Sequence, residues 1–514
     1  MDLGNAANYS DSILSLSVPL FVIFMVIVTK KVALSLLLGI ALGGILAFYH
    51  EPLKILFYIY KNISSVFYSF DENGEFIVSF HSIYVFLFLI LLGILTQIIF
   101  YCGAINSFVN WAHKKVSNPR SSEFITFIAG IIIFVDDYFN ALTVGQISKS
   151  LNDANKSSRE RLAYIIDSTS APVCVLAPIS SWGAYIIGVM DESMPKDLGG
   201  GLALLTSSIW SNYYAWFALL AVFLSIFWQI NLPTMQKNVN VGVKDLLDKK
   251  QTLDKTSSIW LLIIPIFTLM ISITTILFWS GYKASEIPTL MNILSNTNTA
   301  FSLFYGGLLT IIVSVLVSIK HLKISYTFII IKKGFLNMLP AIVILILAWS
   351  IGPVIRDDMQ TGIYLANMGK NMISSDFIIF IPAMLFIISA FIAFATGTSW
   401  GVFAIMIPIG TSIISAAGGD IVLGLSAILA GAVFGDHSSP ISDTTILSAT
   451  GAGCSIQSHF ITQLPYVFSV AVISLLSFIV AGIYGVLSGY IVGISTTILL
   501  FYLYKKYLSK PIIL

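Results

Sequence analysis

The sequence predicts an all-α, polytopic membrane protein with inverted repeats, each containing a re-entrant hairpin and a broken helix. Hydrophobic residues make up 57% of the 514 residues, charged residues only 10%, and the mean hydropathy is +0.91. Soluble domains are about one-quarter charged. Apolar runs of spanning length also recur along the chain. Finally, two aspartate-bearing stretches without Lys or Arg, 134–145 and 435–453, lie inside apolar segments.

Apolar length predicts about 11 full spans and two hairpins, since a span needs about 20 apolar residues. The first span is expected to be retained, because no Lys or Arg precedes Lys30 and a cleavable leader begins with positive charge. The three cysteines are isolated, which favours packing roles over a disulfide or metal set. The predicted spans are 12–29, 32–49, 80–101, 160–188, 203–228, 258–281, 298–319, 334–354, 421–454, 462–484 and 488–504.

Basic residues on both sides of one apolar stretch, 122–148, predict a re-entrant hairpin that turns near residues 136–140. Lys and Arg residues lie at 113–120 and again at 149–161. Positive loops stay cytoplasmic, so this stretch enters and leaves the membrane on the same side. The same rule places the N-terminus outside and the C-terminus in the cytoplasm. It also makes the second hairpin, 376–414, open to the outside.

The two halves share a motif order that predicts inverted repeats. In each half a hairpin precedes a broken span, and both broken spans contain an Asp followed by Ser and Pro. Because the hairpins open to opposite sides, the repeats are inverted, which is a secondary-transporter architecture. The predicted units are a first repeat at 1–230 with hairpin 122–148 and broken span 160–188, a cytoplasmic linker at 231–257, a second repeat at 258–485 with hairpin 376–414 and broken span 421–454, and an additional C-terminal span and tail at 488–514.

Pro172 and Pro440 are expected to interrupt the two broken spans. Proline has no N–H, so the carbonyls of Ser168 and Asp436 lose their helical donors. Freed carbonyls, hydroxyls and carboxylates are the hard oxygen ligands that small cations prefer. A simple helix kink is the alternative, although the flanking Asp, Ser and Gly residues favour a site.

The first hairpin carries two neighbouring aspartates, a pattern that predicts cation binding. By their spacing Asp136, Asn140 and Thr143 share one helix face, and Asp137 lies about 100° round. An ionisable residue at membrane depth survives chiefly where it has a partner or a function. One carboxylate would face the cation while the other is held by hydrogen bonds or carries the proton, which lets the two ions compete. The alternative is that one of them caps the second half-helix.

Other polar residues in the interruptions complete the predicted site. Asp167, Asp436 and Asp443 are single acids whose alternative role is to cap a half-helix. His437 is either a proton carrier or a structural residue beside a cap, and hydroxyls also bond helices together. The predicted ion- and proton-binding residues are Asp136, Asp137, Asn140, Thr143, Asp167, Ser168, Ser170, Thr396, Thr398, Ser399, Asp436, His437, Ser438, Ser439, Asp443 and Thr444, of which Asp137 and Asp436 are the predicted Na+ ligands.

At four motifs the chain resembles the NhaC-type Na+/H+ antiporter family. They are FVDDYFNALTVG, DSTSAPVCVLAPISSWG, ATGTSWGVFAIMIPIG and GDHSSPISDTTILSATGAG. The resemblance extends over residues 80–465. It implies a multi-pass protein of the bacterial inner membrane that exchanges Na+ for protons, in a fold with paired hairpins. The family also includes proteins similar to sodium/organic-acid exchangers, so the resemblance leaves the substrate open.

The sequence therefore predicts a secondary active transporter that exchanges Na+, or Li+, for H+ by alternating access. The predicted partners are the lipid bilayer and monovalent cations; a homodimer is left open, and no cofactor is expected besides the transported ions. A basic tract for nucleic acid is lacking, and the aspartate contexts differ from those of intramembrane aspartyl proteases, so no enzyme is expected. The alternative is a Na+- or H+-coupled carrier of a small organic acid or amino acid, with half-helix N-termini and Arg356 holding the carboxylate.

Overall fold

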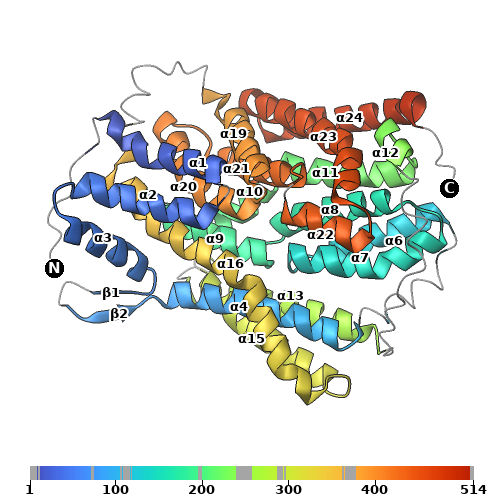
Figure 1. Ribbon diagram of the computed structural model, residues 1–514, viewed down its shortest axis with the longest axis horizontal. Coiled ribbons are helices and arrows are strands. Elements are labelled where there is room, and N and C mark those ends of the chain that lie inside the picture. The colour runs from blue at the N-terminus through green and yellow to red at the C-terminus, as the bar shows by residue number, and fades with distance from the viewer. Residues whose placement is uncertain are drawn as a thin grey trace.

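Helices form almost the whole of the computed structural model, and the described strands make one short hairpin (Figure 1). Large apolar side chains remain exposed on many helices, as expected where lipid rather than water surrounds them. The structure describes residues 12–29, 31–70, 74–104, 118–194, 200–238, 257–285, 297–361, 378–440 and 442–509, together with the single residues 9, 107, 116, 293 and 364.

Three described elements up to residue 238 lie where no span was predicted: the helix α3, a strand hairpin, and the short helix α12 in the predicted linker. Residues of β1 and β2 pair antiparallel, with Ser69 opposite Ile77. The bounds are α1 (Ser17–Thr29), α2 (Val32–Ala47), α3 (Pro52–Ser64), β1 (Tyr68–Phe70), β2 (Phe76–Val78), α4 (Phe80–Tyr101), α6 (Pro119–Ile132), α7 (Asp137–Ala154), α8 (Arg159–Val175), α9 (Ser181–Ser193), α10 (Gly200–Ile209), α11 (Tyr213–Phe227) and α12 (Pro233–Asn238).

In the second half, the described helices again follow the apolar runs. Most of the predicted linker 231–257 and the start of the predicted second hairpin, residues 376–377, lie outside the described residues. The bounds are α13 (Trp260–Ala284), α15 (Thr299–Ser318), α16 (Thr327–Pro353), α19 (Ile381–Thr396), α20 (Ser399–Ala417), α21 (Ile421–His437), α22 (Asp443–Ala452), α23 (Ile456–Tyr484) and α24 (Val486–Leu503).

Seven helices in the described part of the chain are long and apolar enough to cross a membrane, or eight if the bent pair α10–α11 counts as one span. They are α4, α13, α15, α16, α20, α23 and α24, while α1, α2, α19 and α21 are apolar but shorter. The total of about 11 spans therefore stays a prediction.

The first predicted hairpin is present as two helices, α6 and α7, but its turn lies at residues 133–136, earlier than the predicted 136–140, because residues 137–140 already belong to α7. Asn118 caps α6 by accepting a hydrogen bond from the Ser121 N–H at 2.9 Å, and Pro119 occupies the first helical position. The turn precedes Asp137, the first residue of α7, so both aspartates lie at the helix junction. Whether the hairpin is re-entrant stays a prediction.

Each predicted broken span is divided, but the first division is not at the expected proline. Pro172 lies inside α8, and the break falls at residues 176–180. Residues 160–175 of α8 are all buried, and this tertiary packing offsets the roughly 3 kcal/mol that a proline costs a helix interior. In the second span the break at residues 438–442 does contain Pro440.

The second hairpin turns at Gly397 and Thr398, between α19 and α20. Gly397 has φ +70°, a left-handed conformation that glycine adopts without strain. This lets α19 end sharply and α20 begin at Ser399. Helix α19 packs along α21, the first half of the broken span.

One basic residue used in the topology prediction is not a loop charge. Arg161 belongs to α8 and is 2% exposed. Its guanidinium binds the Glu123 carboxylate through two hydrogen bonds of 2.8 Å and 2.7 Å and donates to the Ile230 carbonyl at 2.6 Å. Arg161 therefore neutralises a buried acid of α6 and adds nothing to the positive-inside bias. That bias depends on the other basic residues around the hairpin. Some of them fall within residues 108–115, which lie outside the described part of the chain.

Helices α4, α13, α15 and α16 form a group along one side of the molecule (Figure 1). Within it α13 packs on α15, and both α15 and α16 pack on α4. Helix α16 runs from this group to the rest of the protein, where it contacts α2, α9 and α20. The helix breaks lie in the remaining part, and both α16 and α4 reach it there, since α4 also packs on α9.

Candidate functional site

Each hairpin turn is hydrogen-bonded to the broken helix of its own half. In the first half the Ser181 N–H donates to the Val135 carbonyl at 2.9 Å, and the Cys174 thiol donates to the Phe134 carbonyl at 3.3 Å. In the second half the Ser439 hydroxyl donates to the Phe394 carbonyl at 2.8 Å. Backbone groups that the breaks leave without helical partners are thus satisfied by the neighbouring break, as burial requires.

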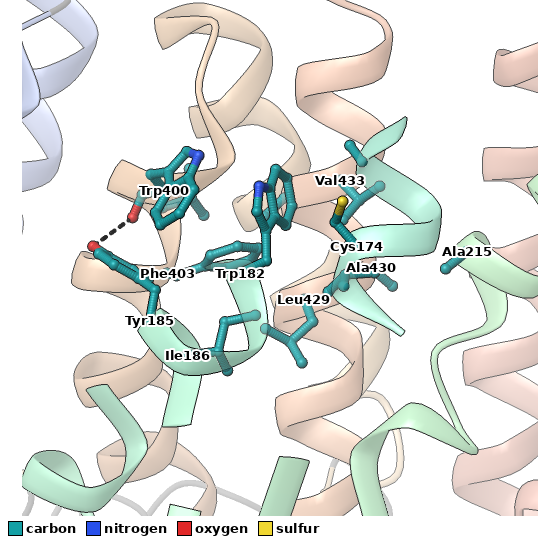
Figure 2. Close-up of a cluster of buried hydrophobic side chains, with 14 of the residues drawn as sticks. Cys174, Trp182, Tyr185, Ile186, Ala215, Trp400, Phe403, Leu429, Ala430 and Val433 are labelled. Carbon is teal, nitrogen blue, oxygen red and sulfur yellow. Dashed lines mark hydrogen bonds between the residues drawn. The ribbon is translucent and has the colours of Figure 1, made fainter. Parts of the chain in front are cut away.

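The two halves meet through aromatic side chains. Figure 2 shows the Tyr185 hydroxyl donating to the Trp400 carbonyl, at 3.0 Å. The rings of Trp182 and Trp400 lie 5.7 Å apart, and Trp182 also meets Phe403 edge-on at 5.4 Å. Edge-to-face pairs of this kind add about 0.5–1.5 kcal/mol each to area burial. Trp182 and Trp400 therefore pack α9 against α20 beside the hairpin turns.

The two neighbouring aspartates of the first hairpin have different surroundings. Asp136 is 2% exposed and accepts a hydrogen bond from the Ser181 hydroxyl at 2.8 Å. Asp137 is 1% exposed, and neither of its carboxylate oxygens has a hydrogen-bond partner in the described part of the chain. Trp182 Nε1 is also buried without an acceptor there. Asp137 lies at the start of α7, where the helix dipole favours a negative charge.

Asp436 is instead held by three donors. Its Oδ2 accepts from the Ser399 N–H at 3.1 Å and from the Ser399 hydroxyl at 2.7 Å, while its Oδ1 accepts from the Ser442 hydroxyl. Ser399 begins α20 and Ser442 caps α22. The carboxylate thus joins the second hairpin to the second helix break. Asp436 itself lies in the last turn of α21, and the N-cap of α22 is Ser442. Cation binding by Asp436 stays a prediction.

Asn140 uses its amide group to close the first hairpin. Its Nδ2 donates to the carbonyls of Gly130 at 2.7 Å, Ile133 at 2.8 Å and Thr169 at 3.1 Å. These bonds tie α7 to α6 and α8. Only Oδ1 of Asn140, which has no partner among the described residues, is left for an ion. Thr143 is buried one turn further along α7.

Asp167 has partners that the sequence analysis missed. Its Oδ2 accepts from His459 Nε2 at 3.0 Å and Gln463 Nε2 at 2.9 Å, with the Thr445 hydroxyl at 3.4 Å and His437 Nε2 at 4.0 Å. His459 and Gln463 lie four residues apart on α23, so they share one helix face. These two polar residues, spaced one helical turn apart on α23, were the feature of the sequence that could have pointed to partners for a buried acid.

The remaining predicted hydroxyls are mostly engaged in local bonds. Four of them bond within their own helix or its cap, and the other two, Ser439 and Ser168, join neighbouring elements. The contacts are Thr396 to the Ile392 carbonyl (2.8 Å), Ser170 to the Asp167 carbonyl (3.3 Å), Ser438 to the Gly435 carbonyl (3.3 Å), Ser439 to the Phe394 carbonyl (2.8 Å), Thr444 with the Ser442 hydroxyl (2.9 Å) and Ser168 with His437 Nε2 (3.2 Å).

A cavity of about 80 Å³ lies where the two hairpins, α22 and α16 meet. Tyr138 bridges its walls by donating to the Asp443 carboxylate at 3.0 Å. The α16 residues were not predicted, although Asn337 and Pro340 are the kind of polar and helix-breaking residues that mark a site within a span. The lining residues are Asp136, Tyr138, Asn337, Met338, Pro340, Ile344, Thr398, Trp400 and Asp443.

Residues 173–483, more than half of the chain, match the model of the Na+/H+ antiporter family. The chain belongs to the Na+/H+ antiporter family. This confirms the family predicted from the four motifs. The matched range includes the second hairpin and second broken span, while the FVDDYFNALTVG hairpin precedes it.

Three known proteins are similar to this antiporter-family chain. An uncharacterised protein of Haemophilus influenzae is 34% identical over 513 residues, 97% of this chain and 96% of that protein. The Malate-2H(+)/Na(+)-lactate antiporter of Bacillus subtilis is 34% identical over 158 residues, 30% of this chain and 32% of that protein. The YdaH transporter of Alcanivorax borkumensis shares the fold, with a TM-score of 0.53 and 13% identity over 90% of this chain and 98% of that one.

The family and the shared fold confirm a helical, multi-pass membrane protein of a transporter class. The inverted repeats, the orientation of the termini and the inner-membrane location stay predictions.

Proposed function

We propose that this protein exchanges Na+, or Li+, for H+ by alternating access, with Asp137 as the carboxylate that binds the cation. The observation that carries the proposal is that Asp137 is buried while neither carboxylate oxygen has a donor among the described residues. An isolated buried carboxylate is too costly to persist as a bare charge, so it needs a cation or a proton. In a bacterial inner membrane, proton entry would drive Na+ out.

The cavity beside Asp136 supports a cation as the cargo, although Asp137 is a neighbour of its wall and not one of its lining residues. Among the described residues its lining includes Asp136 and Asp443 and no Lys, Arg or His. The N-terminus of α20, which could attract an anion, is already bound by Asp436. A volume of about 80 Å³ suits a cation with a few waters, whereas drug-sized ligands occupy about 300–1,000 Å³.

A Na+- or H+-coupled organic-acid exchanger is the second candidate, because one partial relative is a Malate-2H(+)/Na(+)-lactate antiporter. Such a site needs a positive group for the carboxylate. Arg356 was the sequence candidate, but its side chain lies outside the described part of the chain. Among the described residues that line the cavity there is no positively charged side chain to bind the carboxylate of an organic acid.

The test is transport by purified protein in proteoliposomes that contain a pH-sensitive dye. When Na+ is added outside, protons should leave and the lumen should become alkaline across about pH 6.5–9, where carboxylates with altered proton affinity exchange protons. Asp137→Asn should abolish this signal. Asp420→Asn is the matched control, because Asp420 is exposed, caps α21 by accepting from the Leu423 N–H, and Asn caps equally well.

Absence of Na+-dependent proton flux in the wild type would overturn the proposal. If labelled malate or lactate then moved in exchange for Na+, the organic-acid function would replace it. Normal flux in Asp137→Asn would remove Asp137 from the cation site.

A further inference from the structure

A second buried polar cluster lies between α8, α22 and α23, and the proposed cation site does not use it. At its centre Asp167 is fully buried and binds His459 and Gln463, which are also fully buried. The proposal below rests on the proposed Na+/H+ exchange and assigns the proton to residues distinct from Asp137.

The cluster has three polar atoms without partners. Asp167 Oδ1, His459 Nδ1 and Gln463 Oε1 have no hydrogen-bond partner among the described residues. A buried acceptor or donor without a partner is destabilising, because it has lost its hydrogen bonds to water. Two of the three belong to groups that take up a proton, an imidazole and a carboxylate already joined through Nε2 and Oδ2 at 3.0 Å. The arrangement therefore has capacity for one more proton.

One hydrogen bond leads from the pair toward α22. The Thr445 hydroxyl donates to Asp167 Oδ2 at 3.4 Å. Thr445 lies in the first turn of α22, whose capping residue Ser442 binds Asp436. The pair is thus linked to the helix break that holds the second hairpin.

Other charged or titratable groups lie on every helix around Asp167. The nearest is His437 of α21, whose Nε2 lies 4.0 Å from Asp167 Oδ2 and whose two ring nitrogens contact the hydroxyls of Ser168 and Tyr214. His459 is closer to Asp167, at 3.0 Å, and its Nδ1 has no partner among the described residues, so it is the histidine paired with Asp167. The other groups are Tyr164 on α8, whose ring lies 4.7 Å from that of Tyr466 on α23; Tyr214 on α11; Asp436 on α21 and Asp443 on α22, both hydrogen-bonded; Asp137 on α7; and Glu123 on α6, paired with Arg161.

We propose that Asp167 and His459 form the proton-carrying site of the transporter, separate from the cation site at Asp137. When loaded, the pair takes one proton from water and its net charge changes from −1 to 0; when it unloads, the proton returns to water on the other side. The neutral loaded pair crosses a low-dielectric region at lower cost than the charged one. Helix α22 contacts both the Asp167–His459 pair and the helix break at Asp436. Binding of a proton by the pair therefore acts on α22, the helix that also borders the cation site.

The experiment separates Na+ movement from proton movement. His459→Gln keeps a hydrogen-bond donor for Asp167 but cannot carry a proton, and Asp167→Asn removes the carboxylate. His321→Gln, outside the cluster, is the matched control. Each purified variant is measured for Na+-driven proton flux, for exchange of ²²Na+ against Na+, which moves no proton, and for thermal stabilisation by added Na+.

Both cluster variants should keep Na+-induced stabilisation and ²²Na+/Na+ exchange, while Na+-driven proton flux falls about 100-fold, as for loss of a positioned proton-transfer group. Their Na+/Na+ exchange should also lose its dependence on pH. The proposal is wrong if His459→Gln retains proton flux, or if it loses Na+ stabilisation together with exchange, since the pair would then belong to the cation site. A wild type without Na+ movement would instead mean that the proposed function itself fails.

Discussion

At the residue scale, Asp137 and Asp436 differ in hydrogen bonding although both are nearly fully buried. Asp436 accepts three hydrogen bonds from Ser399 and Ser442, and Asp137 accepts none from the described residues. A carboxylate held by three donors is an anchor, because moving it leaves those donors unpaired. A carboxylate without donors can exchange its counter-ion. The same residue type therefore has two physical roles.

Substitution of the two acids should separate these roles. Asp137→Asn and Asp436→Asn should both abolish coupled transport while membrane insertion is retained. Asp436→Asn should also lower stability by about 1.5–3 kcal/mol, since it replaces a charged acceptor. Asp137→Asn should leave the melting temperature unchanged or raise it, because it removes an uncompensated charge. Tryptophan fluorescence during heating in detergent measures both; equal destabilisation would contradict the distinction.

At the element scale, helices α7 and α22 approach closely at two glycines. A Cβ on Gly145 would lie 2.5 Å from Gly451 Cα and 2.7 Å from its carbonyl carbon. Both are backbone atoms, so rotation of a side chain cannot relieve the clash. Small residues at such contacts let helices pack in a membrane. The contact fixes the helix that begins with Asp137 against the helix that begins with Asp443.

Gly145→Ala should therefore displace α7 from α22. We expect a loss of about 1–3 kcal/mol in stability, as for overpacked cores, and a marked fall in Na+-driven proton flux. The control is Gly352→Ala in α16, where a new Cβ meets no atom within 4 Å. Both variants are compared by thermal unfolding and by the dye assay in proteoliposomes. Wild-type flux in Gly145→Ala would show that the close contact is unimportant for transport.

At the scale of the whole molecule, the cavity lies between two parts of the structure. Asn337 and Pro340 line it from α16, which belongs to the group with α4, α13 and α15. Asp136 and Thr398 line it from the two hairpins. Relative movement of these two parts would open the cavity to one side or the other, which is the form that alternating access takes in repeat-based transporters.

The predicted orientation of the chain in the membrane can be measured directly. In a variant whose three cysteines are replaced by alanine, a single Glu75→Cys should react with a membrane-impermeant thiol reagent in intact cells. A single Lys506→Cys should react only after the membrane is opened, because the positive-inside rule places the C-terminus in the cytoplasm. Both positions are exposed. Labelling of Lys506→Cys in intact cells would reverse the orientation, and with it the direction in which each hairpin opens.

Several features of the fold and site were predictable because their causes are local. The break at residues 438–442 contains a proline, and the hairpin turn at 133–136 lies between two apolar runs flanked by basic residues. The position of the first break, at residues 176–180, was not predictable from the sequence. Burial of α8 on all sides keeps Pro172 helical, and burial is a property of the folded structure. The partner of Asp167 was missed because His459 lies 292 residues away.

The membrane class and the family followed from the sequence, because hydropathy and motif order are read along the chain. The cost of intramembrane charge also pointed to four acids that are buried, Asp136, Asp137, Asp167 and Asp436. Asp443, predicted with them, is exposed, and the buried Glu123 and Glu160 were not predicted.

Tertiary structure alone decided which acid is held and which lacks donors. Ser399 lies 37 residues from Asp436 and Ser181 lies 45 residues from Asp136, so their hydroxyls reach these acids only after the hairpins dock. Ser442 is six residues from Asp436, across the second helix break. Hydrogen bonds have a range of about 3 Å. Bonds between residues far apart in the sequence form only when folding brings these residues together, so the sequence does not reveal them.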